Sequence, residues 1–152
     1  MKFFLDENAP ITMLGPLRDL FYDHEFRSAE NEGTTAMTDI ALFELLGSRK
    51  FDAIITRDQN QLRDADERAA LIHNGLHWIG LGGASIKGIR GIALETAAVM
   101  GSMPEIVEHM RELESPSAFH VKGLGAQPGQ RYRLSPMLLP DGSTGRARAA
   151  AA

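Results

Sequence analysis

Short strand-like runs alternate with helix-like segments through most of this chain. The runs lie at residues 2–5, 24–28, 51–56 and 77–81, and the segments between them repeat apolar residues at helical spacing. When helices alternate with strands, successive strands pair in parallel, because each helix carries the chain back to the same end of the sheet. The sequence therefore predicts a layered α/β fold around a central, mainly parallel sheet.

Capping and breaking residues set the expected bounds of the helices. The helices are predicted at residues 10–21, 38–48, 61–74, 89–101 and 104–113. Asn8 and Pro10 suit the start of the first helix, and Gly75 suits the end of the third. Pro16 lies inside the first helix and removes a backbone hydrogen bond, so that helix either kinks or begins there. A break at residues 102–104 separates the last two.

The pattern changes after residue 115. Two short β-rich runs, 118–121 and 131–134, flank a segment rich in glycine, which is typical of a β-hairpin. From residue 140 the chain is mostly small and polar residues or alanine, which is typical of disorder. Three parts are therefore expected: a catalytic domain at 1–115, a C-terminal hairpin extension at 116–139 and a disordered tail at 140–152.

Composition excludes several classes of protein. No run approaches the roughly 18 to 20 apolar residues of a membrane span, and the N-terminus lacks the pattern of a secretion signal. Cysteine is absent, which excludes disulfides and thiolate metal sites and favours the cytoplasm. Residues 1–112 hold 11 Lys and Arg against 18 Asp and Glu, whereas residues 113–152 hold 5 against 2. A nucleic-acid substrate would therefore need metal ions or a local basic patch to approach.

Acidic residues follow two of the predicted parallel strands. Asp6 and Glu7 come directly after the first strand, and Asp58 comes just after the third. Sites in parallel sheets lie beyond the carboxyl ends of the strands, so these acids are expected at one edge. Asp39 opens the helix before the third strand and faces the same way as its apolar side chains. Glu44 of that helix takes its place if the register differs.

Carboxylates gathered in this way favour a bound cation. Like charges at close range raise one pKa of each pair unless a cation lies between them. Mg²⁺ and Mn²⁺ prefer oxygen ligands, and a metal so held activates water and stabilises charge on a phosphate. The residues therefore predict phosphodiester hydrolysis. A structural role stays open for each acid: Asp6 as a turn residue, and Asp39 and Asp58 at the starts of helices.

Two motifs give the chain a family resemblance. The string FFLDENAP, followed by a helix, and the later string IITRDQN resemble the PIN-domain nuclease superfamily, closest to its compact PIN-like branch. The resemblance covers about residues 2–81. It implies a three-layer PIN-like fold and a ribonuclease that cuts RNA phosphodiester bonds internally with Mg²⁺ or Mn²⁺. It also implies that the protein is the toxin of a toxin–antitoxin pair.

The resemblance implies a role for each motif residue. Asp6, Asp39 and Asp58 would be the catalytic acids that bind the metal. The supporting residues would be Glu7, Asn8, Thr56, Arg57 and Asn60. Thr56 and Arg57 would shape the turn that presents Asp58, and Asn8 would position water or phosphate.

One position departs from the family pattern. Members of this branch often carry a second acid where this chain has Asn60, and an amide is a weaker metal ligand. The number of metals, one or two, is therefore open. So is an alternative function, in which a catalytically weak or inactive PIN-like module acts by binding protein or RNA.

Basic residues outside the motifs are candidates for binding RNA or a partner. Lys87 and Arg90 follow a glycine-rich turn, and Lys122, Arg131 and Arg133 belong to the predicted hairpin. The hairpin residues suit an RNA backbone or an acidic protein segment. The expected partners are an RNA substrate, a cognate antitoxin protein and a second copy of the chain, with no membrane.

Overall fold

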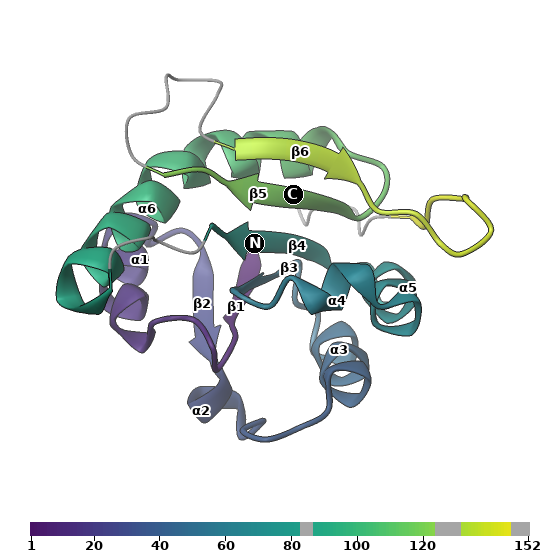
Figure 1. Cartoon of the computed structure of the whole chain (residues 1–152), viewed down its shortest axis with the longest axis horizontal. Helices are drawn as coiled ribbons and strands as arrows, with labels where there is room; N and C mark the ends of the chain where they lie inside the picture. Colours follow the sequence, from purple (N-terminus) through teal and green to yellow (C-terminus); the bar gives the residue numbers. More distant parts are fainter. Residues whose placement is uncertain (83–86, 124–131, 147–152) are drawn as a thin grey trace.

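One sheet organises the molecule. The computed structural model describes residues 1–82, 87–123 and 132–146, and its strands follow the order β2-β1-β3-β4-β5-β6 (Figure 1). They are β1 (Lys2–Leu5), β2 (Glu25–Ser28), β3 (Ala53–Thr56), β4 (His77–Leu81), β5 (Ser117–Val121) and β6 (Tyr132–Pro136). Strands β1 to β5 pair in parallel, and β6 pairs antiparallel with β5. The predicted α/β fold, mainly parallel sheet and C-terminal hairpin are confirmed.

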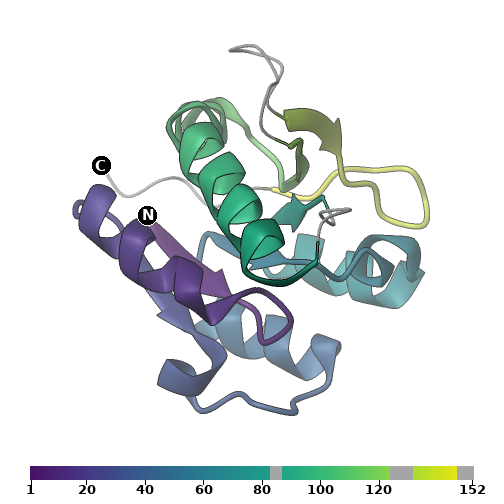
Figure 2. The same cartoon turned by 60° about the vertical axis from the view of Figure 1, so that its left-hand side comes forward.

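Helices cover both faces of the sheet. They are η1 (Ile11–Met13), α1 (Leu14–Leu20), α2 (Ala29–Glu32), α3 (Asp39–Ser48), α4 (Asn60–Arg63), α5 (Ala65–His73) and α6 (Gly88–Glu112). Helices α1 and α6 pack on one face, and α3 and α5 pack on the other (Figures 1 and 2). The result is three layers with a separate apolar core on each side of the sheet.

The strands read as continuous apolar runs because both faces are buried. Side chains alternate along β1, so that Phe3 and Leu5 belong to the core under α1 and α6, whereas Phe4 belongs to the core under α3 and α5. In β3, Ile55 and Ile54 divide in the same way. Each of these apolar side chains therefore packs in one of the two cores.

The first predicted helix is two elements rather than one kinked helix. The chain passes from η1 into α1 at Leu14, and Pro16 is the third residue of α1. The first turn of a helix has no internal acceptors for its N–H groups, so proline costs little at this position.

The predicted break at residues 102–104 is wrong. Helix α6 runs for 25 residues with Pro104 inside it. Met103, Ile106 and Val107 are all buried, so the apolar face that packs on the sheet continues through the proline. Packing of that face offsets the hydrogen bond that proline removes. Among the described helices, α6 included, none is both long and apolar enough to cross a membrane.

The predicted helix at 61–74 is divided. Asp64 separates α4 from α5, and its side chain accepts hydrogen bonds from the backbone N–H groups of Asp66 and Glu67. An aspartate that caps in this way starts a new helix. Helix α4 follows β3 directly and therefore lies at the carboxyl edge of the sheet.

The end of the chain continues past the hairpin. Within 140–146, the described part of the predicted tail, Gly142 N–H donates to the Leu139 carbonyl, and Ser143 O accepts from Leu139 N–H. Residues 147–152 lie outside the described residues. The three-part division of the chain stays a prediction.

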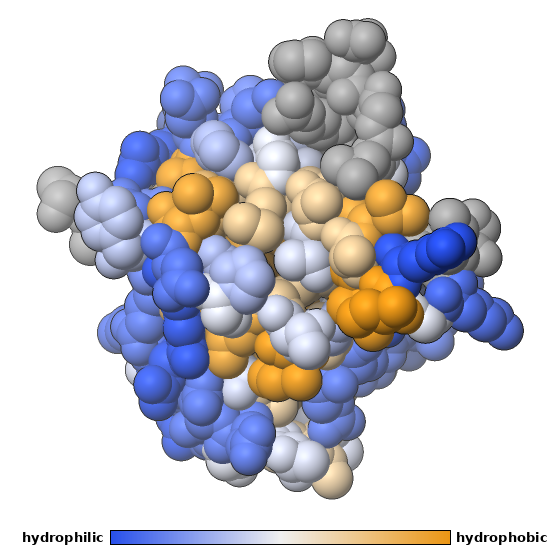
Figure 3. All heavy atoms as spheres, turned by 90° about the vertical axis from the view of Figure 1, so that its left-hand side faces the viewer, coloured by the Kyte–Doolittle hydropathy of each residue, from blue (hydrophilic) through white to orange (hydrophobic). Residues whose placement is uncertain are grey.

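The side of the molecule that holds α1 and α6 carries exposed apolar side chains. Figure 3 looks onto the side of the molecule that holds these helices and shows apolar groups among hydrophilic ones. The large apolar residues that η1, α1 and α6 leave exposed are Ile11, Leu20, Ile89 and Leu94. Scattered residues of this kind are common on protein surfaces and do not by themselves define a binding site.

A buried histidine in β4 makes stability depend on pH. His77 is 3 % exposed, its Nδ1 accepts a hydrogen bond from Ser117 N–H, and burial lowers its pKa to about 4. The unfolded chain binds a proton at this residue near pH 6.5, so stability is lost as pH falls from there toward 4. We expect His77 to account for a loss of about 3 kcal/mol in the free energy of unfolding.

Urea unfolding at several pH values measures this effect. His77→Asn keeps an acceptor for Ser117 N–H and should remove most of the slope between pH 6.5 and 4. His73→Asn makes the same change at an exposed residue of α5 and is the matched control. Equal slopes in wild type and His77→Asn would contradict the prediction.

Candidate active site

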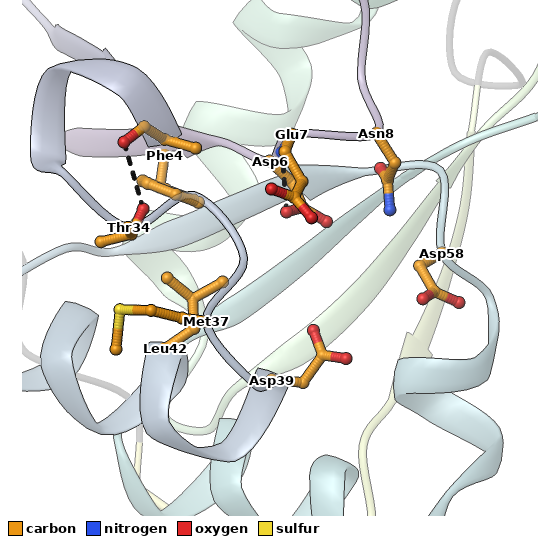
Figure 4. Close-up of a pocket in the computed structure, with 10 residues that line it drawn as sticks. Phe4, Asp6, Glu7, Asn8, Thr34, Met37, Asp39, Leu42 and Asp58 are labelled. Atoms are coloured by element: carbon orange, nitrogen blue, oxygen red, sulfur yellow. Dashed lines mark hydrogen bonds between the residues drawn. The ribbon is translucent and has the colours of Figure 1, made fainter.

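The three predicted acids line one pocket. Asp6 follows β1, Asp58 follows β3 and Asp39 opens α3, and together they border a hollow of about 100 Å³ (Figure 4). Strands β1 and β3 are parallel neighbours, so the residues after them meet at one edge of the sheet. The structure thus brings together residues that lie far apart in the sequence.

Asp6 is the most buried of the three acids. Its side chain is held at both oxygens, since Oδ1 accepts from Glu7 N–H at 2.8 Å and Oδ2 accepts from the Thr56 hydroxyl at 2.7 Å. Burial raises the pKa of Asp6, although the hydrogen bond from Thr56 opposes this. These hydrogen bonds therefore fix the orientation of the Asp6 carboxylate, but they do not offset the whole cost of burying its negative charge.

Hydrogen bonds of Asn8 and Thr56 join the two sequence motifs, FFLDENAP and IITRDQN. Asn8 Oδ1 accepts from Arg57 N–H at 2.9 Å and lies 3.1 Å from Thr56 Oγ1. Thr56 Oγ1 in turn accepts from Asp58 N–H at 3.0 Å. The oxygen of Asn8 thus holds the turn that presents Asp58.

Asp58 also contacts the start of helix α4. Its Oδ1 accepts from Asn60 N–H at 2.8 Å, which is the structural role left open for this residue. Asn60 itself is exposed. One oxygen of Asp58 thus serves the start of α4 while the residue borders the pocket.

Asp39, rather than Glu44, is the acid that α3 brings to the pocket. Asp39 is half-buried and borders the hollow, whereas Glu44 is exposed and does not. Burial raises the pKa of Asp39, and the charges of Asp6 and Asp58 raise it further. The negative charges of Asp6 and Asp58 therefore make ionisation of Asp39 less favourable.

The segment that contains these acids also matches a known family. A family model described as a PIN like domain matches residues 1–83, more than half of the chain. The chain belongs to the PIN-like family. PIN domains form a nuclease superfamily whose members are typically metal-dependent. No curated protein and no solved structure matches the chain.

The candidate site, as described, has no closely grouped set of metal ligands. Within residues 1–82, 87–123 and 132–146, no three His, Cys, Asp or Glu side chains are grouped closely enough to hold an ion together. The chemistry of the pocket nevertheless fits a hard divalent cation, because its donors are carboxylate oxygens: burial raises the pKa of Asp39, and repulsion from the charges of Asp6 and Asp58 raises it further. A cation would relieve this repulsion.

Three further polar residues interact with residues of the candidate site, and sequence patterns did not assign them to it. Gln61 is fully buried and donates from Nε2 to Asp39 Oδ1 at 2.7 Å. Glu67 is half-buried, and its pKa is raised by burial and then by the charge of Asp39. Glu95 of α6 forms an ion pair with Arg57. The one available signal was that Gln61 falls on the apolar face of the predicted helix that it opens.

Glu7 supports the wall of the pocket. Its Oε2 accepts from Ala36 N–H at 3.1 Å, and this contact holds the loop that contributes Thr34 and Met37 to the lining. Ala36 has φ 63°, in the left-handed region that favours glycine. The loop therefore stores backbone strain beside the site.

We expect Ala36→Gly to raise the free energy of unfolding by about 0.5–1 kcal/mol. The left-handed conformation costs alanine about 1–2 kcal/mol, and the added flexibility of glycine offsets part of the gain. Chemical denaturation measures the change. Ala41→Gly makes the same substitution inside α3 and should lower stability instead. Destabilisation by both would contradict the prediction.

The predicted basic residues are only partly placed at the edge that holds the site. Lys122 follows β5 and Lys87 precedes α6, and both are exposed beyond strands that run parallel to β3. Arg90 is exposed in the first turn of α6. Arg133 pairs with His120, which lies in register with Gly80 of β4 and through it with Thr56 of β3, so Arg133 lies at the level of that edge but on the outer strand β6. Arg131 lies outside the described residues.

Proposed function

We propose that this PIN-like protein is a metal-dependent endoribonuclease that hydrolyses RNA phosphodiester bonds. The observation that carries the proposal is the single pocket bordered by Asp6, Asp39 and Asp58. These carboxylates would hold Mg²⁺ or Mn²⁺. When bound, the ion would supply an activated water and stabilise negative charge on the phosphate.

The other residues of the site would prepare it for RNA. Thr56 directs the carboxylate of Asp6, and Asn8 holds the backbone of the turn that carries Asp58. Lys87 and Lys122 would attract the RNA backbone to an edge that is otherwise acidic. The acids would thus carry out catalysis, and the two surface lysines would attract the substrate.

We place this activity in the cytoplasm, as the toxin of a toxin–antitoxin pair. The family resemblance supports this setting, and the absence of cysteine from the sequence fits a reducing compartment. Expression of the chain alone should arrest growth, and co-expression of the antitoxin protein should relieve it. Continued growth under expression of an active nuclease would contradict the toxin role while leaving the chemistry intact.

Cleavage of RNA by the purified chain tests the activity. Labelled RNAs of mixed sequence are incubated with Mn²⁺, with Mg²⁺ or with EDTA. We expect cutting only with the metals, with ends bearing a phosphate on one side and a hydroxyl on the other. Cutting in EDTA that leaves cyclic phosphate ends would contradict metal-dependent hydrolysis.

Asn60 favours a second candidate function. It is neutral and exposed where relatives often carry an acid, so the same fold would act by binding RNA or protein. This module would bind RNA with little dependence on divalent metal and would leave it uncut. Asn60→Asp distinguishes the two candidate functions. The added acid should raise the rate of RNA cleavage if the protein is a nuclease and should produce no cleavage if it is a binding module.

A further inference from the structure

A buried glutamine lies between two of the candidate metal ligands. Gln61 belongs to the short helix α4 and has no exposed surface. Its Nε2 is 2.7 Å from Asp39 Oδ1 and 3.4 Å from Asp6 Oδ2. A carboxamide nitrogen carries two hydrogens, so Gln61 is able to donate one to each carboxylate.

Trp78 fixes which way the amide of Gln61 points. The indole Nε1 of Trp78 lies 3.2 Å from Gln61 Oε1, in the core beside β4. An indole N–H only donates, so the amide oxygen must face Trp78 and the amide nitrogen must face the acids. Reversal of the amide would place N–H against N–H on one side and oxygen against carboxylate on the other.

Gly80 in turn leaves room for Trp78. A Cβ atom at Gly80 would lie 1.8 Å from Cη2 of the indole, which is far inside van der Waals contact. The indole thus lies over the backbone of β4 in a place that only glycine admits. A continuous series of contacts therefore runs from Gly80 through Trp78 and Gln61 to the pocket.

The two acids depend on Gln61 to different degrees. Asp6 is also held by Thr56 and by Glu7 N–H. In the part of the chain that the structure describes, the Asp39 carboxylate has no hydrogen-bond partner other than Gln61. Loss of the amide would therefore free Asp39 to turn toward solvent and would leave Asp6 in place.

We propose that Gln61 is a positioning residue that directs Asp39 into the pocket and thereby sets the affinity of the site for a divalent cation. The inference rests on the proposed function, since it concerns the same three acids. Residues that orient metal ligands typically change metal affinity by about 10–100-fold when replaced. Gln61 would act in this way through Asp39.

Calorimetric titration of the full chain with Mn²⁺, without RNA, tests the role of Gln61. Gln61→Met keeps the length of the side chain and removes both donors, and it should weaken Mn²⁺ binding by about 10-fold or more. Gln59→Met makes the same change two residues away, at a side chain that forms no hydrogen bond with the three acids in the described part of the chain, and should bind like wild type. In an Asp39→Asn background, Gln61→Met should add little further loss, because Gln61 acts through Asp39.

Trp78→Phe provides an independent variant if Gln61→Met fails to fold. It keeps an aromatic ring and Gln61 itself but removes the N–H that orients the amide, so Mn²⁺ binding should weaken several-fold. Wild-type affinity in each folded variant, with Mn²⁺ bound by the wild type, would overturn the positioning role alone. A wild-type chain that binds no Mn²⁺ would overturn the proposed metal-dependent function as well.

Discussion

Asp6→Asn and Asp58→Asn should each lower the rate of RNA cleavage by at least about 100-fold at saturating Mn²⁺. Groups that only orient metal ligands contribute about 10–100-fold, so the ligands themselves should contribute more. Both substitutions keep the size of the side chain and one acceptor oxygen. Asp6→Asn loses the second acceptor, but the Thr56 hydroxyl is then able to donate to Asn8 Oδ1 instead. The loss should therefore come from the missing charge, as measured by single-turnover cleavage of a labelled RNA.

Asp6→Asn should lower activity without lowering stability. Burial raises the pKa of Asp6 in the folded protein, so its stabilising contribution exists at low pH and is lost as pH rises through that pKa. At neutral pH without metal, Asp6→Asn should unfold no more easily than wild type. Asp66→Asn, at an exposed acid of α5, is the control and should keep full activity. Full activity in Asp6→Asn would remove the basis of the proposed site.

Arg57→Met should cost about 2–3 kcal/mol of stability. Arg57 Nε lies 3.1 Å from each oxygen of Glu95, and Arg57 Nη2 contacts Glu95 Oε2 as well. The side chain of Glu95 is 3 % exposed, so removal of Arg57 leaves a carboxylate buried without its charge partner. Loss of one partner from a fully buried pair costs about 3–5 kcal/mol, and the value is smaller here because Arg57 is 40 % exposed.

The reverse substitution should be milder. In Glu95→Gln the freed guanidinium of Arg57 is able to reach solvent, and the buried amide carries no charge. The double variant Arg57→Met with Glu95→Gln should recover much of the stability lost in Arg57→Met. Urea denaturation measures all three. Equal destabilisation by the two single variants would show that burial of the Glu95 charge is not the cause.

The strands, and the meeting of Asp6 and Asp58 at one edge of the sheet, were predictable from local sequence. Strands buried on both faces appear as apolar runs, and residues after parallel strands must meet at one edge. This reasoning placed Asp6 beside Asp58 without knowledge of the structure. It also favoured Asp39, although only the observed register of α3 excludes Glu44 from the pocket.

The supporting residues were not predictable in the same way. Gln61 and Glu95 are buried polar residues, and each is satisfied by a partner distant in sequence. A place on the apolar face of a helix, as for Gln61, indicates burial but does not identify the distant partner or a role in the site. Local rules also failed at Pro104, where packing of α6 on the sheet outweighs the helix-breaking effect of proline.

Anomalous diffraction from crystals soaked in Mn²⁺ tests the central claim most directly. The account predicts a Mn²⁺ peak bounded by carboxylate oxygens of Asp6, Asp39 and Asp58, and loss of this peak in Asp58→Asn crystals. A saturating soak that leaves this pocket without a peak, or that places the ion elsewhere in the molecule, would contradict it.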